Sequence, residues 1–402
     1  MTRPGRIEAA RRGSITVRGV EAIVVNAEMR NWVFVKVTTS EPELVGWGEA
    51  TLEWQTQGVV GAIADLAPLL LGEDVLRTEH LWQAMYRHHF FRGGVVTMSA
   101  LSGLDQAFHD LAGKIRGVPT YELLGGAVRD HVRFYDHLGG GDSDAVYGGA
   151  AEPARFGELA ERSVADGFDA LKVLAIPPTR MLDGQAAIRH GVQRLEAVRA
   201  AVGPDVDVMV DLHGRTTPAM AIQYGLAMAP SSPWFIEEPC LPENAEALAE
   251  VARALPIPIA SGERLGTRFD FRRLLELRAC AIIQPDVCHC GGLTELRKIA
   301  AMADAYFVSV APHNPLGPIA TMANLHFAFA TPNFLIQEVM RSDVPWRNDV
   351  VDFPVEIVDG RAYPPTRPGL GIAIDEKVAR THPYRPERDM RVFHADGSIA
   401  DW

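Results

Sequence analysis

The sequence predicts an α/β fold, a (β/α)8-type (TIM-like) barrel with an α+β capping domain at its N-terminal side. Across residues 131–349, short apolar runs alternate with helical patterns, as in parallel sheets buried on both faces. Three of these runs end in an acidic residue, and the intervals between Asp211, Glu237 and Glu263 are both 26 residues. This interval suits one strand–helix repeat. A barrel needs about 250 residues, so the 402-residue chain has room for a second unit.

The first 130 residues lack the repeat and predict the capping domain. Three segments alternate and are rich in β-branched residues, as antiparallel strands are: 15–26, 31–39 and 45–50. Helical patterns follow at 57–72, 77–89 and 96–116. Strands followed by helices indicate a separate α+β unit. The aromatic and basic loops 27–32 and 88–94 are expected either to cover the barrel mouth or to pack in the core or in an interface.

The barrel domain, 131–349, is expected to hold eight strands. They are 132–137, 169–175, 206–211, 234–238, 257–262, 280–286, 307–312 and 334–338. Helical stretches are expected near 184–202, 217–229, 243–254, 268–278, 292–305 and 317–329. The tail, about 350–402, is punctuated by proline and glycine, so we expect extended segments that complete the capping domain.

Composition narrows the class of protein. The net charge of −12 argues against a broad nucleic-acid surface. The basic N-terminus has no apolar signal core and no run reaches membrane-spanning length, which predicts a cytoplasmic protein without a membrane partner. The four cysteines do not resemble a secreted disulfide framework. Cys288, His289 and Cys290 could suggest zinc, but no second ligand pair is present, so we interpret them as structural.

The three carboxylates predict a metal site. In a parallel barrel the carboxyl ends of the strands converge on one mouth, where active sites lie. Asp211, Glu237 and Glu263 would repel one another there unless a hard cation lies between them, and carboxylates with open water positions suit Mg²⁺. The alternative is that each acid merely caps the helix that follows it.

Other strand ends carry further candidate groups. His213 lies two residues after Asp211, so strand alternation would point both side chains to one face. Asp286 and His313 end the sixth and seventh strands and could form a dyad in which the carboxylate holds the imidazole tautomer. Glu338 ends the eighth strand and Lys172 lies in the second. By contrast, we interpret His109 and His137 as hydrogen-bonded structural residues.

Motifs along nearly the whole chain resemble the enolase superfamily, in its mandelate racemase/muconate lactonizing enzyme-type branch, and specifically galactonate dehydratase-like acid-sugar dehydratases. The matching segments are FRGG, MSALSGLDQAFHDLAGK, DLHGR, FIEEP, SGERLGTRFDFRRLLE, QPDVCHCGG, APHNPLGPIA and HADGSIADW.

This resemblance implies a hydro-lyase of carbohydrate catabolism that converts an aldonic acid, D-galactonate first, into a 2-keto-3-deoxy acid. It implies Mg²⁺ on Asp211, Glu237 and Glu263. The other roles follow by position: His313 as the base, Asp286 as its dyad partner, His213 as the acid that protonates the departing 3-hydroxyl, and Glu338 as a hydrogen-bond partner of the developing enolate. The relatives are commonly oligomeric, so a homo-oligomer is expected.

One position departs from the family. Racemase relatives carry Lys-x-Lys on the second strand and galactonate dehydratase carries Lys-x-Asn, whereas this chain has Leu174 two residues after Lys172. The missing second lysine argues against two-base racemisation, and the missing amide leaves the substrate open. Gluconate, arabonate or mannonate are alternative substrates. A cycloisomerase or epimerase of acid sugars and a non-catalytic binding subunit are alternative functions.

Overall fold

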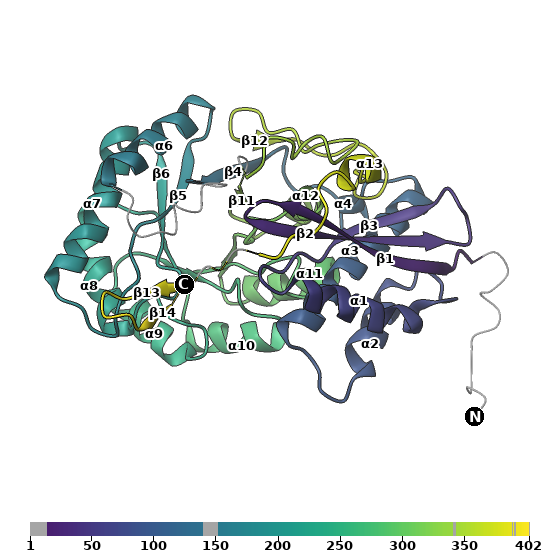
Figure 1. Ribbon diagram of the computed structural model, residues 1–402, viewed down its shortest axis with the longest axis horizontal. Coiled ribbons are helices and arrows are strands. Elements are labelled where there is room, and N and C mark those ends of the chain that lie inside the picture. Colours follow the sequence, from purple (N-terminus) through teal and green to yellow (C-terminus); the bar gives the residue numbers. More distant parts are fainter. Residues whose placement is uncertain (1–13, 140–151, 341–342, 388, 390, 402) are drawn as a thin grey trace.

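The computed structural model describes residues 14–139, 152–340, 343–387, 389 and 391–401. Most of the basic N-terminal segment and the final residue of the closing motif therefore lie outside the described residues. An antiparallel sheet at the right of Figure 1 is formed by β1 (Val17–Ala27), β2 (Arg30–Thr39) and β3 (Val45–Glu49). It is followed by α1 (Thr56–Leu70), α2 (Thr78–His88), α3 (Val95–Arg116) and the short α4 (Thr120–Leu123). No described helix combines the length and apolarity that a membrane span requires.

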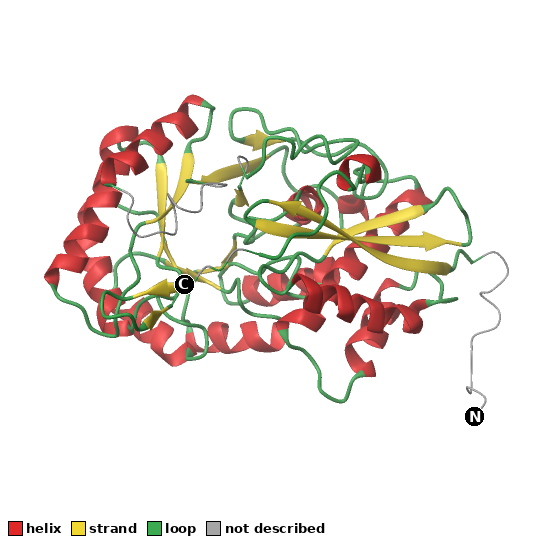
Figure 2. Ribbon diagram, viewed as in Figure 1, coloured by secondary structure: helices red, strands yellow, loops and turns green. Residues whose placement is uncertain are grey.

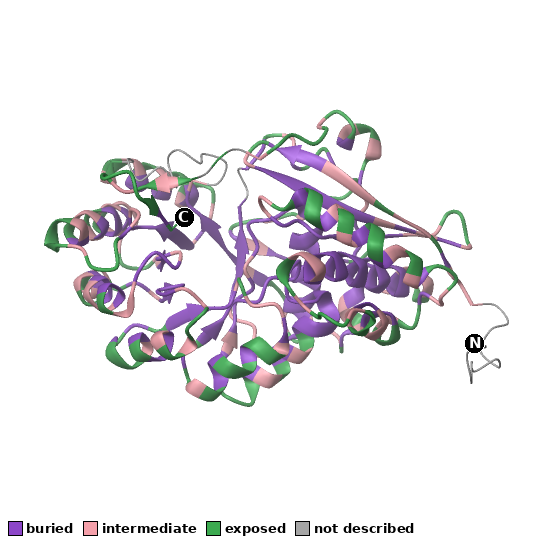
Figure 3. Ribbon diagram, turned by 60° about the horizontal axis from the view of Figure 1, so that its bottom comes forward, coloured by how far each residue is buried: buried purple, intermediate pink, exposed green. Residues whose placement is uncertain are grey.

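Helix α3 forms the core of this first region. It is buried from Met98 to Gly113, and buried residues are purple in Figure 3. The sheet approaches it closely because glycines face each other: a Cβ on Gly48 would lie 1.9 Å from the carbonyl oxygen of Gly103. The helix ends at Gly117, whose φ of 69° favours glycine.

Eight parallel strands form the second region, and the sequence predicted all eight. They are β4 (Val132–His137), β5 (Ala170–Leu174), β6 (Asp207–Asp211), β7 (Ile236–Glu237), β8 (Ile259–Ser261), β9 (Ile282–Ile283), β10 (Ser309–Val310) and β11 (Gln337–Val339). Consecutive strands pair, β11 pairs with β4, and a bridge between Val310 and Phe334 joins β10 to the segment before β11. The sheet therefore closes into a (β/α)8-type barrel.

Helices surround the barrel as Figure 2 shows. They are α6 (Pro153–Ala165), α7 (Gln185–Val202), α8 (Pro218–Met228), α9 (Ala245–Ala254), α10 (Arg268–Leu277), α11 (Gly292–Asp304) and α12 (Pro318–Ala330). The sequence analysis missed α6. Its buried face consists of Phe156, Gly157, Ala160 and Ser163, mostly small residues that give little apolar periodicity.

The barrel interior is layered. A separate apolar cluster takes one buried residue from each strand segment: Tyr135, Ala170, Met209, Phe235, Ala260, Ile282, Ala311 and Ile336. Because strand side chains alternate, the residue two positions further on faces inward one layer nearer the carboxyl ends. This inward layer holds His137, Lys172, Asp211, Glu237, Gly262, Gln284, His313 and Glu338. Apolar residues thus form the floor beneath a polar layer.

The tail contacts both regions. Strand β12 (Arg361–Ala362) pairs antiparallel with β4, and α13 (Glu376–Ala379) packs on β1. The last hairpin, β13 (Val392–Phe393) and β14 (Ile399–Ala400), lies among the barrel helices in Figure 1. The pairing with β4 was not expected from the sequence, because a two-residue strand carries no periodic signal. The boundaries drawn at residues 130 and 350 stay a prediction.

Side chains of the first region are bound to the two barrel helices α11 and α12. Glu49 of β3 accepts hydrogen bonds from the backbone N–H groups of Gly317 and Ala320, at the start of α12. Asp105 of α3 accepts from the backbone N–H and the hydroxyl of Thr294, at the start of α11. Both acids thus bind a helix N-terminus, where negative charge is favoured.

The two aromatic and basic loops differ. Arg30, from segment 27–32, is buried, donates to the backbone oxygen of Pro315 at 2.6 Å and pairs with Glu53. In the 88–94 loop, by contrast, Phe90 and Phe91 are 92% and 88% exposed. Segment 27–32 therefore packs in the interface with the barrel.

Candidate active site

Three acidic side chains converge at the carboxyl ends of β6, β7 and β8. Asp211, Glu237 and Glu263 each offer an oxygen, and these three oxygens lie within 4.8 Å of one another. Asp211 and Glu237 are the last residues of their strands, and Glu263 follows β8 by two residues. The regular spacing in the sequence thus becomes one acidic cluster, which could hold a metal ion.

Local structure fixes the direction of each carboxylate. Asp211 Oδ1 accepts the backbone N–H of His213 at 2.7 Å, and Glu237 Oε2 accepts from Gln284 Nε2 at 2.6 Å. Glu263 follows Gly262, whose φ of 132° and close approach to Phe271 exclude a side chain. A glycine at this point of the inward layer moves the acid one residue further along the chain.

Lys172 of β5 lies beneath the acidic cluster. Its Nζ is 2.5 Å from Glu237, 2.7 Å from Glu338 and 3.7 Å from Asp211. Burial alone would lower the pKa of Lys172, but Glu237 and Glu338 outweigh burial and hold it well above its ordinary value. One buried ammonium therefore offsets part of the charge of several carboxylates.

The remaining negative charge fits a hard cation. Burial raises the pKa of Glu237 well above its ordinary value, and it raises the pKa of Glu263 to about 7. For Glu237 the neighbouring carboxylates raise the pKa further, although Lys172 lowers it. Ionising these side chains together therefore costs free energy. A divalent cation bound among their oxygens would offset this cost.

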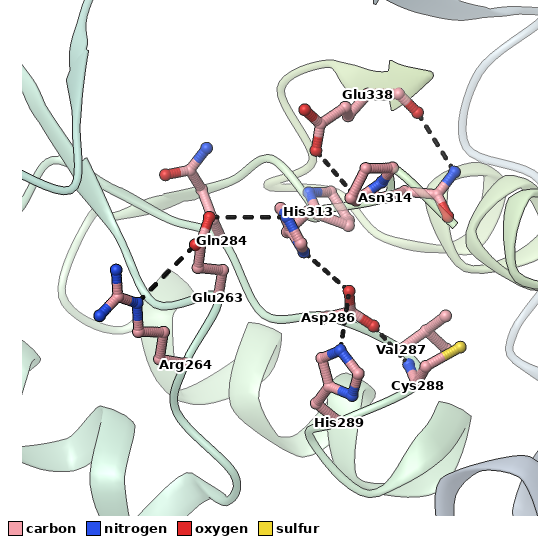
Figure 4. Close-up of polar contacts among 12 residues, drawn as sticks. Glu263, Arg264, Gln284, Asp286, Val287, Cys288, His289, His313, Asn314 and Glu338 are labelled. Carbon is pink, nitrogen blue, oxygen red and sulfur yellow. Dashed lines mark hydrogen bonds and ion pairs between the residues drawn. The ribbon is translucent and has the colours of Figure 1, made fainter. Parts of the chain in front are cut away.

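His313 and Asp286 form a hydrogen-bonded pair beside this cluster (Figure 4). His313 Nδ1–H donates to Asp286 Oδ2 at 2.8 Å, and His313 Nε2 lies 3.6 Å from Glu263 Oε2. Burial alone would lower the pKa of His313, but Glu263 and Asp286 raise it to about 10. The imidazole is thus oriented by one carboxylate and presents its other nitrogen to the acidic cluster.

The pair extends to α3 through His289, which was interpreted from the sequence as structural. His289 Nε2 lies 3.7 Å from Asp286 Oδ2, and its Nδ1 lies 2.9 Å from Ser99 Oγ. Because Ser99 Oγ donates to the carbonyl of Val95, it accepts from His289 Nδ1–H. The spacing Asp286-x-x-His289 was the available signal, since residues three apart in a turn can meet.

His213 lies beside the cluster, but not through strand alternation. Strand β6 ends at Asp211, and His213 adopts a left-handed conformation with φ 55°. The turn brings the backbone N–H of His213 onto Asp211, and Arg264 Nη2 donates to its carbonyl oxygen at 3.0 Å. The alternation argument was wrong here because the strand stops too early.

Glu338 belongs to β11 and contacts the segment after β10 as well as β5. Its Oε2 accepts the backbone N–H of Asn314 at 2.8 Å, and Oε1 faces Lys172. Burial alone would raise the pKa of Glu338, but Lys172 and His313 lower it to about 2. Glu338 is therefore ionised near neutral pH when no substrate is bound.

The two histidines interpreted as structural behave differently. His109 fits that interpretation, since its Nε2 lies 3.0 Å from Thr294 Oγ1. For His137 it was wrong: the ring is 7% exposed, and neither nitrogen has a hydrogen-bond partner within the described ranges. Among the described residues, the group of side chains that could hold a metal ion does not include Cys288, His289 or Cys290.

Two family models match the chain. The model described as mandelate racemase/muconate lactonizing enzyme, N-terminal domain, covers residues 14–125. The model described as enolase C-terminal domain-like covers residues 155–378.

Curated relatives and solved structures agree with these models. A D-galactonate dehydratase of Ralstonia nicotianae is 41% identical over 92% of this chain and 96% of its own length, and one of Cronobacter sakazakii is 39% identical with the same coverage. A mandelate racemase/muconate lactonizing enzyme-like protein from a Roseovarius species has a TM-score of 0.88 at 34% identity, covering 96% of this chain and all of that one. A mandelate racemase/muconate lactonizing enzyme from a Sulfitobacter species has a TM-score of 0.85 at 37% identity, covering 92% and 96%.

Proposed function

The chain belongs to the mandelate racemase/muconate lactonizing enzyme family, and we propose that it is a Mg²⁺-dependent hydro-lyase acting on an aldonic acid. The first-choice substrate is D-galactonate, as the names of the relatives suggest, and the product is a 2-keto-3-deoxy acid. The observation that carries the proposal is a carboxylate-oriented imidazole whose free nitrogen lies 3.6 Å from a member of the acidic cluster.

Asp211, Glu237 and Glu263 would hold the Mg²⁺ ion. Removal of the C2 proton from a carboxylate places a second negative charge on the anion, so this proton is a very weak acid. A bound divalent cation stabilises that charge by several kcal/mol. The buried oxygen ligands, two of which have raised pKa values, support this assignment.

His313 is the proposed base. Asp286 accepts from Nδ1–H, so Nε2 is the atom that takes the C2 proton. A cation held by Glu263 would offset the charge that contributes most to the raised pKa of His313, which would leave Nε2 without a proton. A positioned base contributes about 10²- to 10⁴-fold to the rate. Glu338 accepts from the N–H of Asn314 and is ionised without substrate. It is proposed to take up a proton from solvent when the anionic substrate binds, and to donate it in a hydrogen bond to the substrate oxygen that gains enolate character.

His213 is the proposed general acid. Loss of the 3-hydroxyl as hydroxide is unfavourable, so a proton must reach this oxygen as the C3–O bond breaks. His213 is attached to the metal-side carboxylate Asp211 through its own backbone and lies on a different strand from His313. Base and acid on separate strands can act on C2 and C3 of one substrate. The enol then tautomerises to the 2-keto product.

Racemisation is disfavoured by the second strand. A racemase of the lysine–histidine type needs a base on each face of C2, and Leu174 is buried in the position of the second lysine. Leu174 also lacks the amide of galactonate dehydratases, so gluconate, arabonate and mannonate stay as alternative substrates. Within the same proposal we include a cytoplasmic homo-oligomer, which size-exclusion chromatography would test.

A panel of aldonic acids tests the function. The Mg²⁺-loaded protein should convert at least one acid into a 2-keto acid, detected as its semicarbazone, with D-galactonate giving the highest kcat/KM. Solvent deuterium exchange at C2 without any keto product would instead support an epimerase or cycloisomerase. Metal binding with neither exchange nor product would support the non-catalytic subunit.

A further inference from the structure

His137 is a buried side chain whose ring has no hydrogen-bond partner among the residues that the structure describes. It ends β4 and belongs to the same inward layer as Lys172, Asp211, Glu237, His313 and Glu338. Glu338 Oε1 lies 3.6 Å from Nδ1 of His137, which is beyond hydrogen-bond length. Among the described residues both ring nitrogens lack a hydrogen-bond partner.

An unpaired buried imidazole is costly. Leaving a buried donor or acceptor unsatisfied costs about 1–3 kcal/mol, and two such atoms on one ring invite an explanation. His109 and His326, which are also buried, both have ring partners: Thr294 for the former, Tyr121 N–H and the Leu370 carbonyl for the latter. His137 is the exception, and it lies in the candidate active site.

The place of His137 in the barrel defines what could bind it. In the closed strand order, β4 lies four strands from β8 in both directions, so His137 faces Glu263 across the mouth. A substrate held at C1–C3 by the acidic cluster, His313 and His213 must direct the rest of its carbon chain elsewhere. The strand opposite the acidic cluster is the natural place for it.

The chemistry of the ring suits a hydroxyl. Burial first, and then the positive charge of Lys172, lower the pKa of His137 to about 4, so the ring is neutral at physiological pH. A neutral imidazole has one donor and one acceptor nitrogen, and a sugar hydroxyl can both accept and donate. A carboxylate or an ammonium group would satisfy only one of these capacities.

We propose that His137 is a specificity-determining residue that hydrogen-bonds a substrate hydroxyl beyond C3. The inference rests on the proposed function and deepens it, because it states which part of the protein reads the distal end of the acid sugar. It also accounts for the lack of an amide side chain at Leu174, because His137 on β4 would bind the sugar in place of that amide.

The test compares substrates that differ by one hydroxyl. With Mg²⁺-loaded protein, kcat/KM is measured for the preferred aldonate and for its 4-deoxy, 5-deoxy and 6-deoxy analogues. His137→Phe should lower kcat/KM for the full substrate by about 10- to 100-fold, mainly through KM. For one deoxy analogue, the variant and the wild type should agree within about threefold.

Two further variants keep the test decisive. His137→Gln, with a donor and an acceptor on a flexible chain, should show a smaller loss in the same pattern, and it replaces His137→Phe if that variant does not fold. His109→Phe removes a partnered buried histidine and should lower the melting temperature while leaving the ratio between full and deoxy substrates unchanged.

The outcomes separate this inference from the proposed function. If a His137 variant lowers kcat/KM for every deoxy analogue as much as for the full substrate, His137 does not bind a substrate hydroxyl. The same holds if neither variant lowers kcat/KM for any of these acids. In both cases dehydration by the wild type still stands. If the wild type forms no keto acid from any aldonate, the proposed function fails. Calorimetry in the His313→Asn background, which should bind without turnover, then shows whether His137→Phe still weakens aldonate binding.

Discussion

Two walls of the barrel mouth differ in kind. The metal-side wall, formed by Asp211, Glu237 and Glu263, presents only carboxylates, brought together from three successive strands. The far wall, formed by His137, Lys172 and Glu338, mixes a neutral ring, a cation and an anion. The difference teaches how one scaffold can serve many substrates. Abstraction of the C2 proton needs the same charge whichever sugar is bound, whereas the distal hydroxyls differ and must be read by varied groups.

The largest expected effect comes from a change at His313, which lies between the two walls. His313→Asn removes the proposed base, which follows β10, and the rate of C2 deuterium exchange should fall about 10²- to 10⁴-fold or more. Mg²⁺ affinity, measured by calorimetry, should stay within about threefold, because the ligand oxygens remain. Normal exchange together with lost metal binding would contradict the assignment.

Removal of Lys172 tests whether its positive charge in the far wall offsets the negative charge of the metal-side wall. In EDTA, Lys172→Met leaves Glu237 and Glu338 without their buried cation, and the free energy of unfolding should fall about 3–5 kcal/mol. Mg²⁺ should recover part of this loss. Leu174→Met, a swap of similar volume on the same strand, should cost under about 1.5 kcal/mol. Equal losses in both variants would mean that packing, not charge, dominates.

The pH dependence of metal binding should depend on a carboxylate of the metal-side wall and not on the carboxylate of the far wall. The pKa of Glu263 is raised to about 7 by burial, so protons compete with Mg²⁺ below that pH, and the apparent affinity should fall up to about tenfold per pH unit. Without metal the sign is opposite for stability: the proton on Glu263 stabilises the fold below the ordinary pKa, and this contribution disappears as the pH rises through 7.

Matched variants test this assignment. Glu263→Gln should flatten the pH profile of Mg²⁺ binding. The pKa of Glu338 is lowered to about 2 through Lys172, so Glu338→Gln should leave the slope above pH 5 unchanged. A slope that survives Glu263→Gln would assign the proton to another group.

The smallest expected effect concerns the support of the base. Ser99→Ala removes the acceptor of His289 Nδ1–H, at a cost of about 1 kcal/mol. The rate of C2 exchange should fall about threefold to tenfold with KM unchanged. In a His289→Asn background the Ser99 change should add nothing, since the path to Asp286 is already interrupted. Additive losses would show that Ser99 acts independently of His289.

The regular parts of the molecule could be predicted from the sequence. Buried parallel strands read as short apolar runs, and the even spacing of the three acids reflects the constant size of a strand–helix unit. The Asp286–His313 contact also followed from strand ends that converge. These features depend on local pattern plus one geometric rule, which is why sequence alone was sufficient.

Features set by tertiary contacts could not be predicted. The pairing of β12 with β4 depends on where a long tail returns. The turn at His213 depends on where pairing with the next strand stops. Whether His137 or His109 has a partner depends on side chains 185 residues or more away, such as Thr294, and no local pattern carries that information.

The contacts of Glu49 and Asp105 have one last consequence. These acids bind the first region to the starts of α11 and α12, the helices that follow the strands of the Asp286–His313 pair. The first region cannot move away from α11 and α12 without breaking these buried, charge-assisted hydrogen bonds. We therefore expect sugar and product to pass at another edge of the barrel mouth.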